Sequence, residues 1–413
     1  MVAIEDYKIK PSKKIVDDLV IQIIYIPLES KLGYEYTPTV NTGDYVCIGS
    51  VVGKNAITEI PLLSSVSGTV VGFEEKYISN GKLVNTVVIE NDFKEKYLDK
   101  VGKTKDITKY SRDEFIYLIK KMGIVGMSGN DFPTYIKYDT NKKIKSLIVN
   151  SVECEIYASS DNAVIYNYTE EILEAIDAIM EIMKIDKAYI AVKSNNEIVI
   201  KKLLKHINTY PNIKVFPIMD AYPSGYERYL VKEILGLSYN KLPIEVGAIC
   251  SNVSTIYAIY EAMKYHKPLI DRVVTISGVG IKNPSNYRLK IGTNLNEIVM
   301  KKDIYKKIDN PILIAGGAMM GTSIKNDNLI VTKDLGSILV LSDDTSRPSA
   351  CIKCGKCSEV CPMNLIPSLI IEDKKNAKNL KIDKCIGCGL CSYVCPSKIE
   401  VRELIEIIKG ETK

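Results

Sequence analysis

The chain has 413 residues, of which 25% are charged and 46% are hydrophobic, and its formal net charge is +5. This length is enough for roughly two to four domains, and the composition is that of an ordinary globular protein. The positive charge is spread without a basic block, so no nucleic-acid surface is expected. The longest apolar run, residues 19–28, contains Gln22 and Pro27. Because a membrane span needs roughly 20 apolar residues, no direct span is expected.

Short β-runs separated by turn glycines fill the first part of the chain. They include residues 40–46, 51–53 and 64–70. The pattern resembles a biotinyl/lipoyl-type barrel-sandwich domain. Such carriers display a modified lysine between the two halves of the domain, but no lysine lies between Asn55 and Val70. We therefore expect a structural barrel-sandwich domain without a swinging arm.

A capping box predicts the start of a helix after Ser111. In this motif the side chains of Ser111 and Glu114 each bind a backbone N–H group of the first turn, and an apolar stripe follows until Gly123. Further glycines recur at every third position, as Gly126 and Gly129. Such a loop lets the backbone approach a phosphate closely, although many glycine-rich loops are plain turns. Both alternatives remain open at this point.

Apolar strands and amphipathic helices alternate beyond the loop. Strands are expected at residues 146–149, 189–192 and 213–216, and helices from Thr169 onward and at residues 198–207. This rhythm predicts a parallel sheet with helices outside it. Asn150, Glu153 and Glu155 follow the first strand at its carboxyl end, where open α/β sheets bind ligands. They are candidate ligand-binding residues.

A second β-rich stretch follows, with strand runs at residues 273–278, 291–292 and 312–314 that are bounded by glycine and proline. Gly316, Gly317 and Gly321 come directly after the last run. They form either a plain turn or a loop that faces a bound cofactor.

Eight of the 11 cysteines lie near the carboxyl end of the chain. They form two blocks with the pattern C-x-x-C-x-x-C-x-x-x-C-P, namely Cys351, Cys354, Cys357, Cys361 and Cys385, Cys388, Cys391, Cys395. In this spacing three thiolates bind one four-iron cluster and the fourth binds the other cluster. We therefore assign Cys351, Cys354, Cys357 and Cys395 to one [4Fe–4S] cluster, and Cys361, Cys385, Cys388 and Cys391 to the second. A zinc ribbon would leave half of these cysteines unexplained.

The chemistry of the cysteines also indicates a compartment. Cysteines that hold iron–sulfur clusters need reducing conditions, and the chain shows no signal peptide, so a cytoplasmic location is expected. Cys154 lies outside the two blocks, between Glu153 and Glu155. Their negative charge favours a protonated thiol, so we interpret Cys154 as a packing residue and not as a nucleophile.

Taken together, these segments resemble the RnfC family. The residues that carry the resemblance are Gly126 to Thr134 with Lys137, the Asn150-x-x-Glu153-Cys154-Glu155 segment, Asn252 to Thr255, and Gly316 to Gly321 ahead of the cysteine blocks. Relatives of this family include the electron-transfer protein PrdC of proline reductase. The family's flavin domain resembles the NADH-binding subunit of respiratory complex I.

The resemblance implies an α/β multidomain protein. Its expected parts are a barrel-sandwich hybrid domain at residues 1–100, a Rossmann-like flavin/NADH domain at 101–235, an SLBB-type β-grasp domain at 236–335, and an α-helical two-cluster [4Fe–4S] ferredoxin domain at 336–413. It also implies which residues bind the cofactors. FMN is expected against Gly126, Gly129 and Lys137, with Asn150, Glu153 and Asn252 around its phosphate and ring, and NADH near Phe132 beside Glu155.

Five positions depart from the family pattern. The family's Gly-Gly-Ala-Gly-Phe-Pro-Thr run appears here as residues 128–134, with Ser128 first and Asp131 in place of a glycine. A carboxylate there adds like-charge repulsion toward a phosphate or nicotinamide nucleotide, about 1 kcal/mol when solvated and several kcal/mol when buried. Lys193 stands where relatives carry an acidic residue, and Ile156 replaces the proline after Glu155. These changes leave two alternatives, a retained or a degenerate nucleotide site.

The expected function is electron transfer from a hydride donor, with NADH as the expected donor, through FMN and the two clusters to a partner protein. Flavin suits this task because it accepts two electrons and releases them singly. The expected partner is a reductase such as proline reductase, or an Rnf-type membrane complex, which we rank second. The alternative function is a non-enzymatic iron–sulfur carrier. Lys384 and Lys398, beside cluster ligands, either dock an acidic acceptor or are ordinary surface charges.

Overall fold

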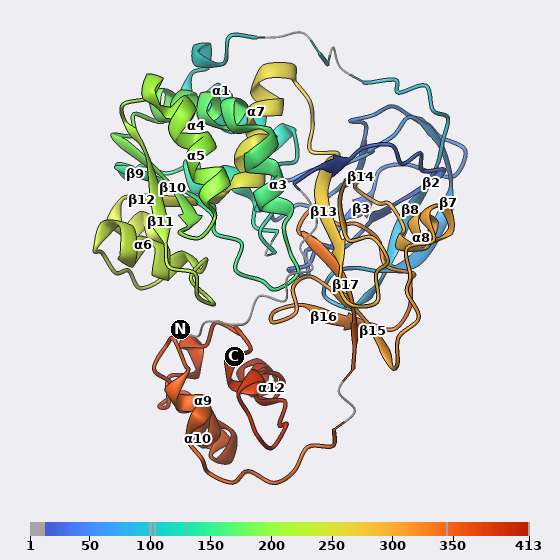
Figure 1. Cartoon of the computed structure of the whole chain (residues 1–413). Coiled ribbons are helices and arrows are strands. Elements are labelled where there is room, and N and C mark those ends of the chain that lie inside the picture. The colour runs from blue at the N-terminus through green and yellow to red at the C-terminus, as the bar shows by residue number, and fades with distance from the viewer. Residues whose placement is uncertain (1–12, 99–100, 103–104, 130, 344–345, 412–413) are drawn as a thin grey trace.

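The computed structural model describes residues 13–98, 101–102, 105–129, 131–343 and 346–411. Figure 1 shows a helix-rich α/β unit, a β-rich unit beside it and a small helical unit below. No helix among the described residues combines the length and the apolar character that a membrane crossing requires.

Two small antiparallel sheets form the first unit. One has the order β2-β8-β7-β4 and the other β3-β5-β6. The strands are β2 (Ile23–Pro27), β3 (Thr37–Pro38), β4 (Tyr45–Val46), β5 (Val51–Lys54), β6 (Leu62–Leu63), β7 (Gly68–Tyr77) and β8 (Leu83–Asn91). Alternate apolar side chains point between the sheets, so that Ile24, Val70 and Ile89 are fully buried. This arrangement fits the expected barrel-sandwich domain.

A four-stranded parallel sheet forms the second unit, with the order β11-β10-β9-β12. Its strands are β9 (Ser146–Ser151), β10 (Lys187–Lys193), β11 (Ile213–Ile218) and β12 (Ala248–Asn252). In chain order this is 3-2-1-4, the strand order of a dinucleotide-binding half. Because β12 pairs with β9, the sheet extends beyond the predicted domain boundary at residue 235.

Helices cover both faces of this sheet (Figure 1). They are α1 (Arg112–Lys121), α2 (Thr134–Tyr138), α3 (Ser160–Asn167), α4 (Thr169–Met183), α5 (Glu197–His206), α6 (Glu227–Leu235) and α7 (Val253–Tyr265). Most of them pack against one large core that includes Phe115, Ile176 and Ile259, and α6 packs on the other face with Leu230. The Ser111 capping box is present as predicted, with the Glu114 side chain 2.8 Å from the Ser111 backbone nitrogen.

A six-stranded mixed sheet has the order β1-β14-β13-β17-β15-β16. Its elements are β1 (Ile15–Val16), β13 (Asp271–Ser277), β14 (Ser285–Lys290), β15 (Pro311–Ala315), β16 (Thr322–Ile324) and β17 (Ser337–Ser342), with helix α8 (Leu295–Lys302). Strand β1 pairs in parallel with β14, so part of the segment predicted as barrel-sandwich joins this sheet. Strand β17 extends the sheet past the predicted boundary at residue 335.

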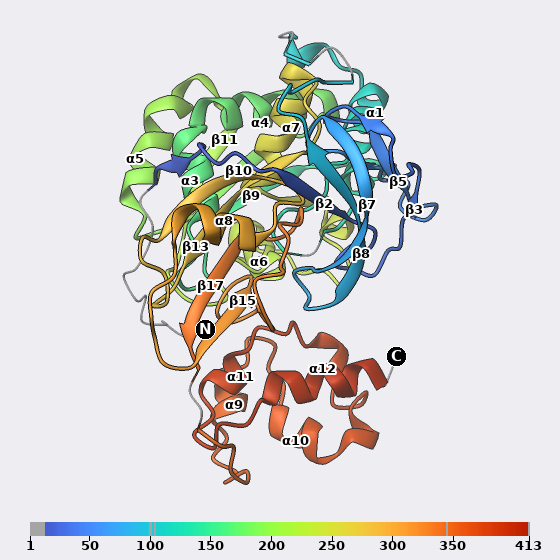
Figure 2. The ribbon, with the colours of Figure 1, turned by 90° about the vertical axis from the view of Figure 1, so that its right-hand side faces the viewer.

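Short helices form the C-terminal unit, which lies beyond the end of the strands β15 and β17 (Figure 2). They are α9 (Lys356–Glu359), α10 (Pro367–Glu372), α11 (Leu390–Tyr393) and α12 (Val401–Glu411). A small core that includes Ile370, Ile382 and Ile405 holds them together. This unit carries all eight cysteines of the two blocks.

Candidate functional site: a parallel-sheet crevice and two cysteine cavities

The strand order reverses between β9 and β12, and two predicted residues meet at this point. Asn150 and Asn252 are register partners at the carboxyl ends of the two strands. The Asn150 amide donates to the Gly225 carbonyl at 2.9 Å, and the Asn252 amide donates to Asp161 at 2.7 Å. A crevice outside the carboxyl ends at such a switch point is where α/β sheets bind nucleotides.

Glu153 lies beside this crevice and caps helix α3. Its carboxylate accepts hydrogen bonds from the Ser160 hydroxyl and the backbone nitrogens of Asp161 and Asn162, each at 3.2 Å. Burial raises the pKa of Glu153 to about 7, and the neighbouring Asp161 carboxylate adds to the rise. The Glu153 carboxylate therefore stabilises the first turn of helix α3. Its role in holding FMN remains a prediction.

The glycine-rich loop closes on itself at the base. The Gly126 nitrogen donates to the Phe132 carbonyl at 2.7 Å. Gly129 has a φ of +97°, and, its chain neighbours aside, no atom of the described residues lies within 4 Å of the position that its Cβ would take. Lys137 follows on α2 and donates to the Cys250 carbonyl at 2.8 Å. Asn130 lies outside the described residues. The loop therefore presents open space at Gly129, as expected of a loop that receives a ligand.

Asp131 does not lie in open solvent but lines a cavity with Lys31 and Lys333, between the loop and the barrel-sandwich unit. Burial raises its pKa to about 7, with the Asp334 charge as the next cause, whereas Lys333 and Lys31 oppose the rise. The Lys333 ammonium also donates to the Gly123 carbonyl at 2.8 Å. Two lysines thus lie close enough to act on the charge of Asp131, which the sequence pattern did not reveal.

Arg272 is the main buried cation of this region, and sequence reasoning missed it. It is only 2% exposed, and its guanidinium donates to the carbonyls of Met127 and Lys333. The acidic groups whose charges act on it are Asp334, Asp161, Asp131 and Glu153, in that order. A single arginine after a strand start gives no sequence signal, because only the fold brings these acids around it.

The surroundings of Cys154 and Lys193 bear on two further expectations from the sequence. Burial, followed by the charge of Glu155, raises the pKa of the Cys154 thiol to about 11, which agrees with the expected protonated thiol. Lys193, at the end of β10, forms an ion pair of 2.7 Å with Asp220. A carboxylate, that of Asp220, is therefore present at this edge of the sheet, although it follows β11 and not β10.

Glu155 lies away from open solvent and binds the glycine-rich connection between β15 and β16. Its carboxylate accepts hydrogen bonds from the backbone nitrogens of Met319 and Met320, both at 2.9 Å. The connection thus contacts the segment that follows β9, and whether it faces a bound flavin remains a prediction. Contact of Glu155 or Phe132 with a nucleotide remains a prediction.

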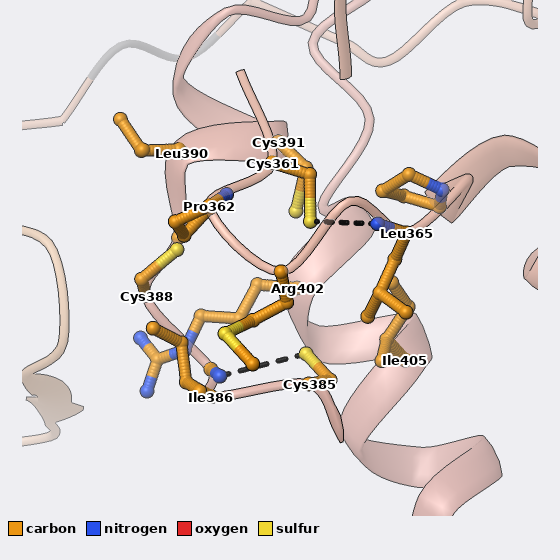
Figure 3. Close-up of a pocket in the computed structure, with 14 residues that line it drawn as sticks. Cys361, Pro362, Leu365, Cys385, Ile386, Cys388, Leu390, Cys391, Arg402 and Ile405 are labelled. Atoms are coloured by element: carbon orange, nitrogen blue, oxygen red, sulfur yellow. Dashed lines mark hydrogen bonds between the residues drawn. The ribbon is translucent and has the colours of Figure 1, made fainter. Parts of the chain in front are cut away.

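Two cavities in the C-terminal unit are each lined by four cysteines. One is lined by Cys361, Cys385, Cys388 and Cys391 (Figure 3). The other is lined by Cys351, Cys354, Cys357 and Cys395. These are the crossed sets that the spacing predicts, three cysteines from one block with the fourth from the other. Their role as iron ligands remains a prediction.

The cavity in Figure 3 suits iron-bound sulfur. Backbone N–H groups reach two of its sulfurs, from Leu365 to Cys361 at 3.4 Å and from Gly387 to Cys385 at 3.5 Å. Such N–H···S bonds stabilise negative charge on a cluster. Burial raises the pKa of the Cys391 thiol to about 12. Since the thiolate is the ligand, metal binding must displace this proton.

Comparisons with known proteins match three of these units, in chain order. The RnfC barrel sandwich hybrid domain family matches residues 2–94, the Nuo51 FMN-binding domain family residues 119–261, and the 4Fe-4S dicluster domain family residues 350–399. The C subunit of the proton-translocating ferredoxin:NAD(+) oxidoreductase complex of Clostridium ljungdahlii is 31% identical over 356 residues, which cover 84% of this chain and 77% of that protein. The chain belongs to the RnfC family.

Other relatives agree with this assignment. The C subunit of the Na(+)-translocating ferredoxin:NAD(+) oxidoreductase complex of Acetobacterium woodii is 31% identical to this chain over 359 residues. The matched residues cover 85% of this chain and 81% of that protein. Among solved structures, a chain of the NAD+-reducing [NiFe]-hydrogenase in the air-oxidized state aligns with a TM-score of 0.50 at 14% identity, over 73% of this chain and 54% of that chain. At this identity the likeness shows a shared fold.

This RnfC-family chain therefore carries an FMN-binding domain and a [4Fe–4S] dicluster domain. The crevice fits a polar cofactor, because the buried hydroxyls of Ser151, at the end of β9, and Ser224, in the loop after β11, have no hydrogen-bond partner among the described residues. Gly129 leaves space in the loop, and Lys137 brings a positive charge to β12, two residues before the end of this strand at Asn252. The two cysteine cavities fit the clusters by their donor sets.

Replacing Gly129 with alanine is expected to lower the FMN content of the purified protein and leave its iron content unchanged. A Cβ at a φ of +97° is strained, by about 1–3 kcal/mol, and it fills the open space in the loop. Gly236→Ala is the matched control, because Gly236 also has a positive φ and empty space but ends helix α6. Flavin absorbance checks both variants, and equal FMN content in the two would contradict the role of Gly129.

Replacing Glu153 with glutamine is expected to weaken the pH dependence of stability between about pH 5.5 and pH 8. The pKa of about 7 in the folded chain lies above the unfolded value of about 4.3. The folded chain thus holds a proton that the unfolded chain has released, and stability falls as the pH rises through this window. The neutral amide removes this contribution.

Thermal unfolding midpoints at the two pH values test this expectation. Glu114→Gln is the control, because the hydrogen bond from the Ser111 backbone lowers the pKa of Glu114. Its carboxylate is ionised in both the folded and the unfolded chain throughout the window, so this variant should keep the wild-type pH dependence. A Glu153→Gln variant that also kept it would contradict the assignment.

Proposed function

We propose that the chain is the NADH-oxidising, electron-transferring subunit of an Rnf-type complex. It accepts reducing equivalents from NADH at FMN and passes single electrons, first to the cluster of Cys361, Cys385, Cys388 and Cys391 and then to the cluster of Cys351, Cys354, Cys357 and Cys395. The relatives named above as members of such complexes support the partner. We further propose that the six-stranded sheet is an SLBB-type β-grasp domain and that the protein works on the cytoplasmic side.

The observation that carries the proposal is the contact between the flavin-domain side and one cysteine cavity. The Tyr222 hydroxyl, from the loop after β11, donates to the Cys388 carbonyl at 2.7 Å. Tyr222, Met319, Cys388 and Leu390 form one buried cluster. This contact supports the proposal that the cluster in the cavity of Cys388 is the one nearer to the flavin. We call this cavity the proximal cavity.

The other cavity, which we call the distal cavity, has a more exposed rim. Cys351 and Cys354 are exposed, and Ile352 between them is 66% exposed. Lys353 and Lys356 flank them at the surface. An exposed apolar side chain with positive charges around it supports docking of an acidic electron-transfer partner here.

The chain's own residues have distinct parts in this function. When bound, FMN accepts two electrons from a hydride and releases them one at a time. The Lys137 ammonium supplies fixed positive charge near the strand ends, and the backbone at Gly126 and Gly129 allows close approach of the cofactor. The eight thiolates hold the clusters, and the N–H groups of Leu365 and Gly387 stabilise charge on the proximal sulfurs.

The test is anaerobic reduction of the purified protein. Protein with FMN and about eight irons should lose flavin absorbance on addition of NADH, and cluster absorbance should fall afterwards.

The second candidate function, an iron–sulfur carrier without nucleotide chemistry, is favoured by Asp131 and Lys193 in the nucleotide region. Protein with the same iron but without flavin would support that carrier and overturn the proposal. A soluble reductase such as proline reductase is the alternative partner, and co-purification with membrane proteins separates the two partners.

A further inference from the structure

The connection between β15 and β16, residues 316–321, is held from the flavin-domain side by one carboxylate. Glu155 follows β9 and binds the backbone nitrogens of Met319 and Met320 at 2.9 Å each. A Cβ on Gly317 would lie 2.1 Å from the Glu155 carboxyl carbon. A side chain at this position would therefore displace the Glu155 carboxylate from the place where it binds the two nitrogens.

The same loop is held from the opposite side by one guanidinium. Arg402, on helix α12 of the cluster domain, donates to the carbonyls of Met319 and Met320 at 3.1 Å each and to that of Gly321 at 3.4 Å. The N–H groups of the loop thus face a carboxylate and its carbonyls face a cation. Charge-assisted hydrogen bonds of this kind are about twice as strong as neutral ones.

The loop also touches the proximal cavity directly. Gly389, between the ligands Cys388 and Cys391, has a φ of +80°, and a Cβ there would lie 2.7 Å from the Met319 carbonyl oxygen. Arg402 itself lines the cavity beside the loop that carries Cys385 and Cys388 (Figure 3). One arginine therefore contacts the loop and also lines the cavity that fits the proximal cluster.

Electrostatics couple the two side chains. Burial raises the pKa of Glu155 above its usual value, and the Met319 and Met320 N–H groups and the Arg402 charge limit this rise. The carboxylate binds the N–H groups and the guanidinium binds the carbonyls of the same two residues, so removal of one charged group leaves the other without the opposite charge beside it. The position of the 316–321 loop thus depends on Glu155 and Arg402 together.

We propose that Arg402 is a positioning residue that, together with Glu155, clamps the 316–321 loop and thereby fixes the proximal cluster at its distance from the flavin. This inference rests on the proposed function. In the step concerned, one electron leaves the reduced flavin and enters the oxidised proximal cluster, and no other reactant is consumed. Because electron transfer weakens steeply with distance, a loosened clamp slows this step and leaves hydride acceptance at the flavin unaffected.

The test compares Arg402→Met, Arg402→Lys and Glu403→Met in the full-length, cluster-loaded protein. Glu403 is the exposed neighbour of Arg402 on α12, so it controls for a change of charge and side chain in this helix. Arg402→Met is expected to raise hydrogen exchange of the 316–321 amides by about tenfold. It should slow cluster reduction after NADH mixing by about tenfold or more, with flavin bleaching and iron content unchanged. Arg402→Lys should restore part of both, and Glu403→Met should resemble wild type.

Three outcomes would overturn the inference. They are unchanged exchange in Arg402→Met, faster exchange with unchanged cluster reduction, and loss of iron in Arg402→Met that would indicate a purely structural role. Failure of the proposed function is distinguishable from these, because it shows in the wild-type protein, as absence of flavin bleaching with NADH.

Discussion

Replacing Cys361 with serine is expected to prevent cluster binding in the proximal cavity, where the other three cysteines come from the second block. The distal cavity, which holds the other three cysteines of its own block, should keep its cluster. Cys361 lines the proximal cavity with Cys385, Cys388 and Cys391, and a serine there leaves a four-iron cluster one thiolate short. The iron content should fall from about eight to about four per chain. FMN should still be bleached by NADH, but electrons should no longer reach the distal cluster.

Double variants separate this crossed assignment from the uncrossed one. Cys361→Ser with Cys388→Ser should keep about four irons, because both residues serve one cluster, whereas Cys361→Ser with Cys354→Ser should lose nearly all iron. The uncrossed assignment gives the reverse result for the two pairs. Iron and sulfide analysis with electron paramagnetic resonance spectra of the reduced proteins decides between them.

Replacing Arg272 with methionine is expected to lower stability by about 3–5 kcal/mol, because it leaves several buried carboxylates without their cation. Arg272 also ties the glycine-rich loop, through the Met127 carbonyl, to the six-stranded sheet. The loss should be smaller near pH 5.5 than near pH 8, since burial already raises the pKa of Asp131 and Glu153 to about 7 each, and protonated carboxyls need no cation.

Urea unfolding at the two pH values tests this expectation. Arg347→Met is the matched control, because Arg347 is exposed and the same substitution there should change stability by less than about 0.5 kcal/mol. A loss for Arg272→Met that equals the control, or that grows toward low pH, would contradict the electrostatic account.

Local signals in the sequence predicted much of the architecture. The Ser111 capping box and the amphipathic stripes predicted α1, α4 and α5, and the apolar runs predicted β9, β10 and β11, because these elements depend on contacts within a few residues. The cysteine spacing likewise predicted which four thiols line each cavity. The candidate residues Asn150 and Asn252 meet because parallel strands end at the same sheet edge.

The remaining features depend on contacts between distant segments. Strand β1 has two residues and no periodicity, so its pairing with β14 has no local signal. Arg272 and Tyr222 stand alone in the sequence, and only the packing of sheets and loops gives them their partners. The double role of the 316–321 loop, between Glu155 and Arg402, likewise joins three segments that no spacing rule connects.

Quantitative analysis of iron, acid-labile sulfide and zinc in the anaerobically purified protein tests the central claim most directly. About eight irons and eight sulfides per chain, with negligible zinc, are the expected result, because two cavities of four cysteines each are present. Stoichiometric zinc without sulfide would contradict the account.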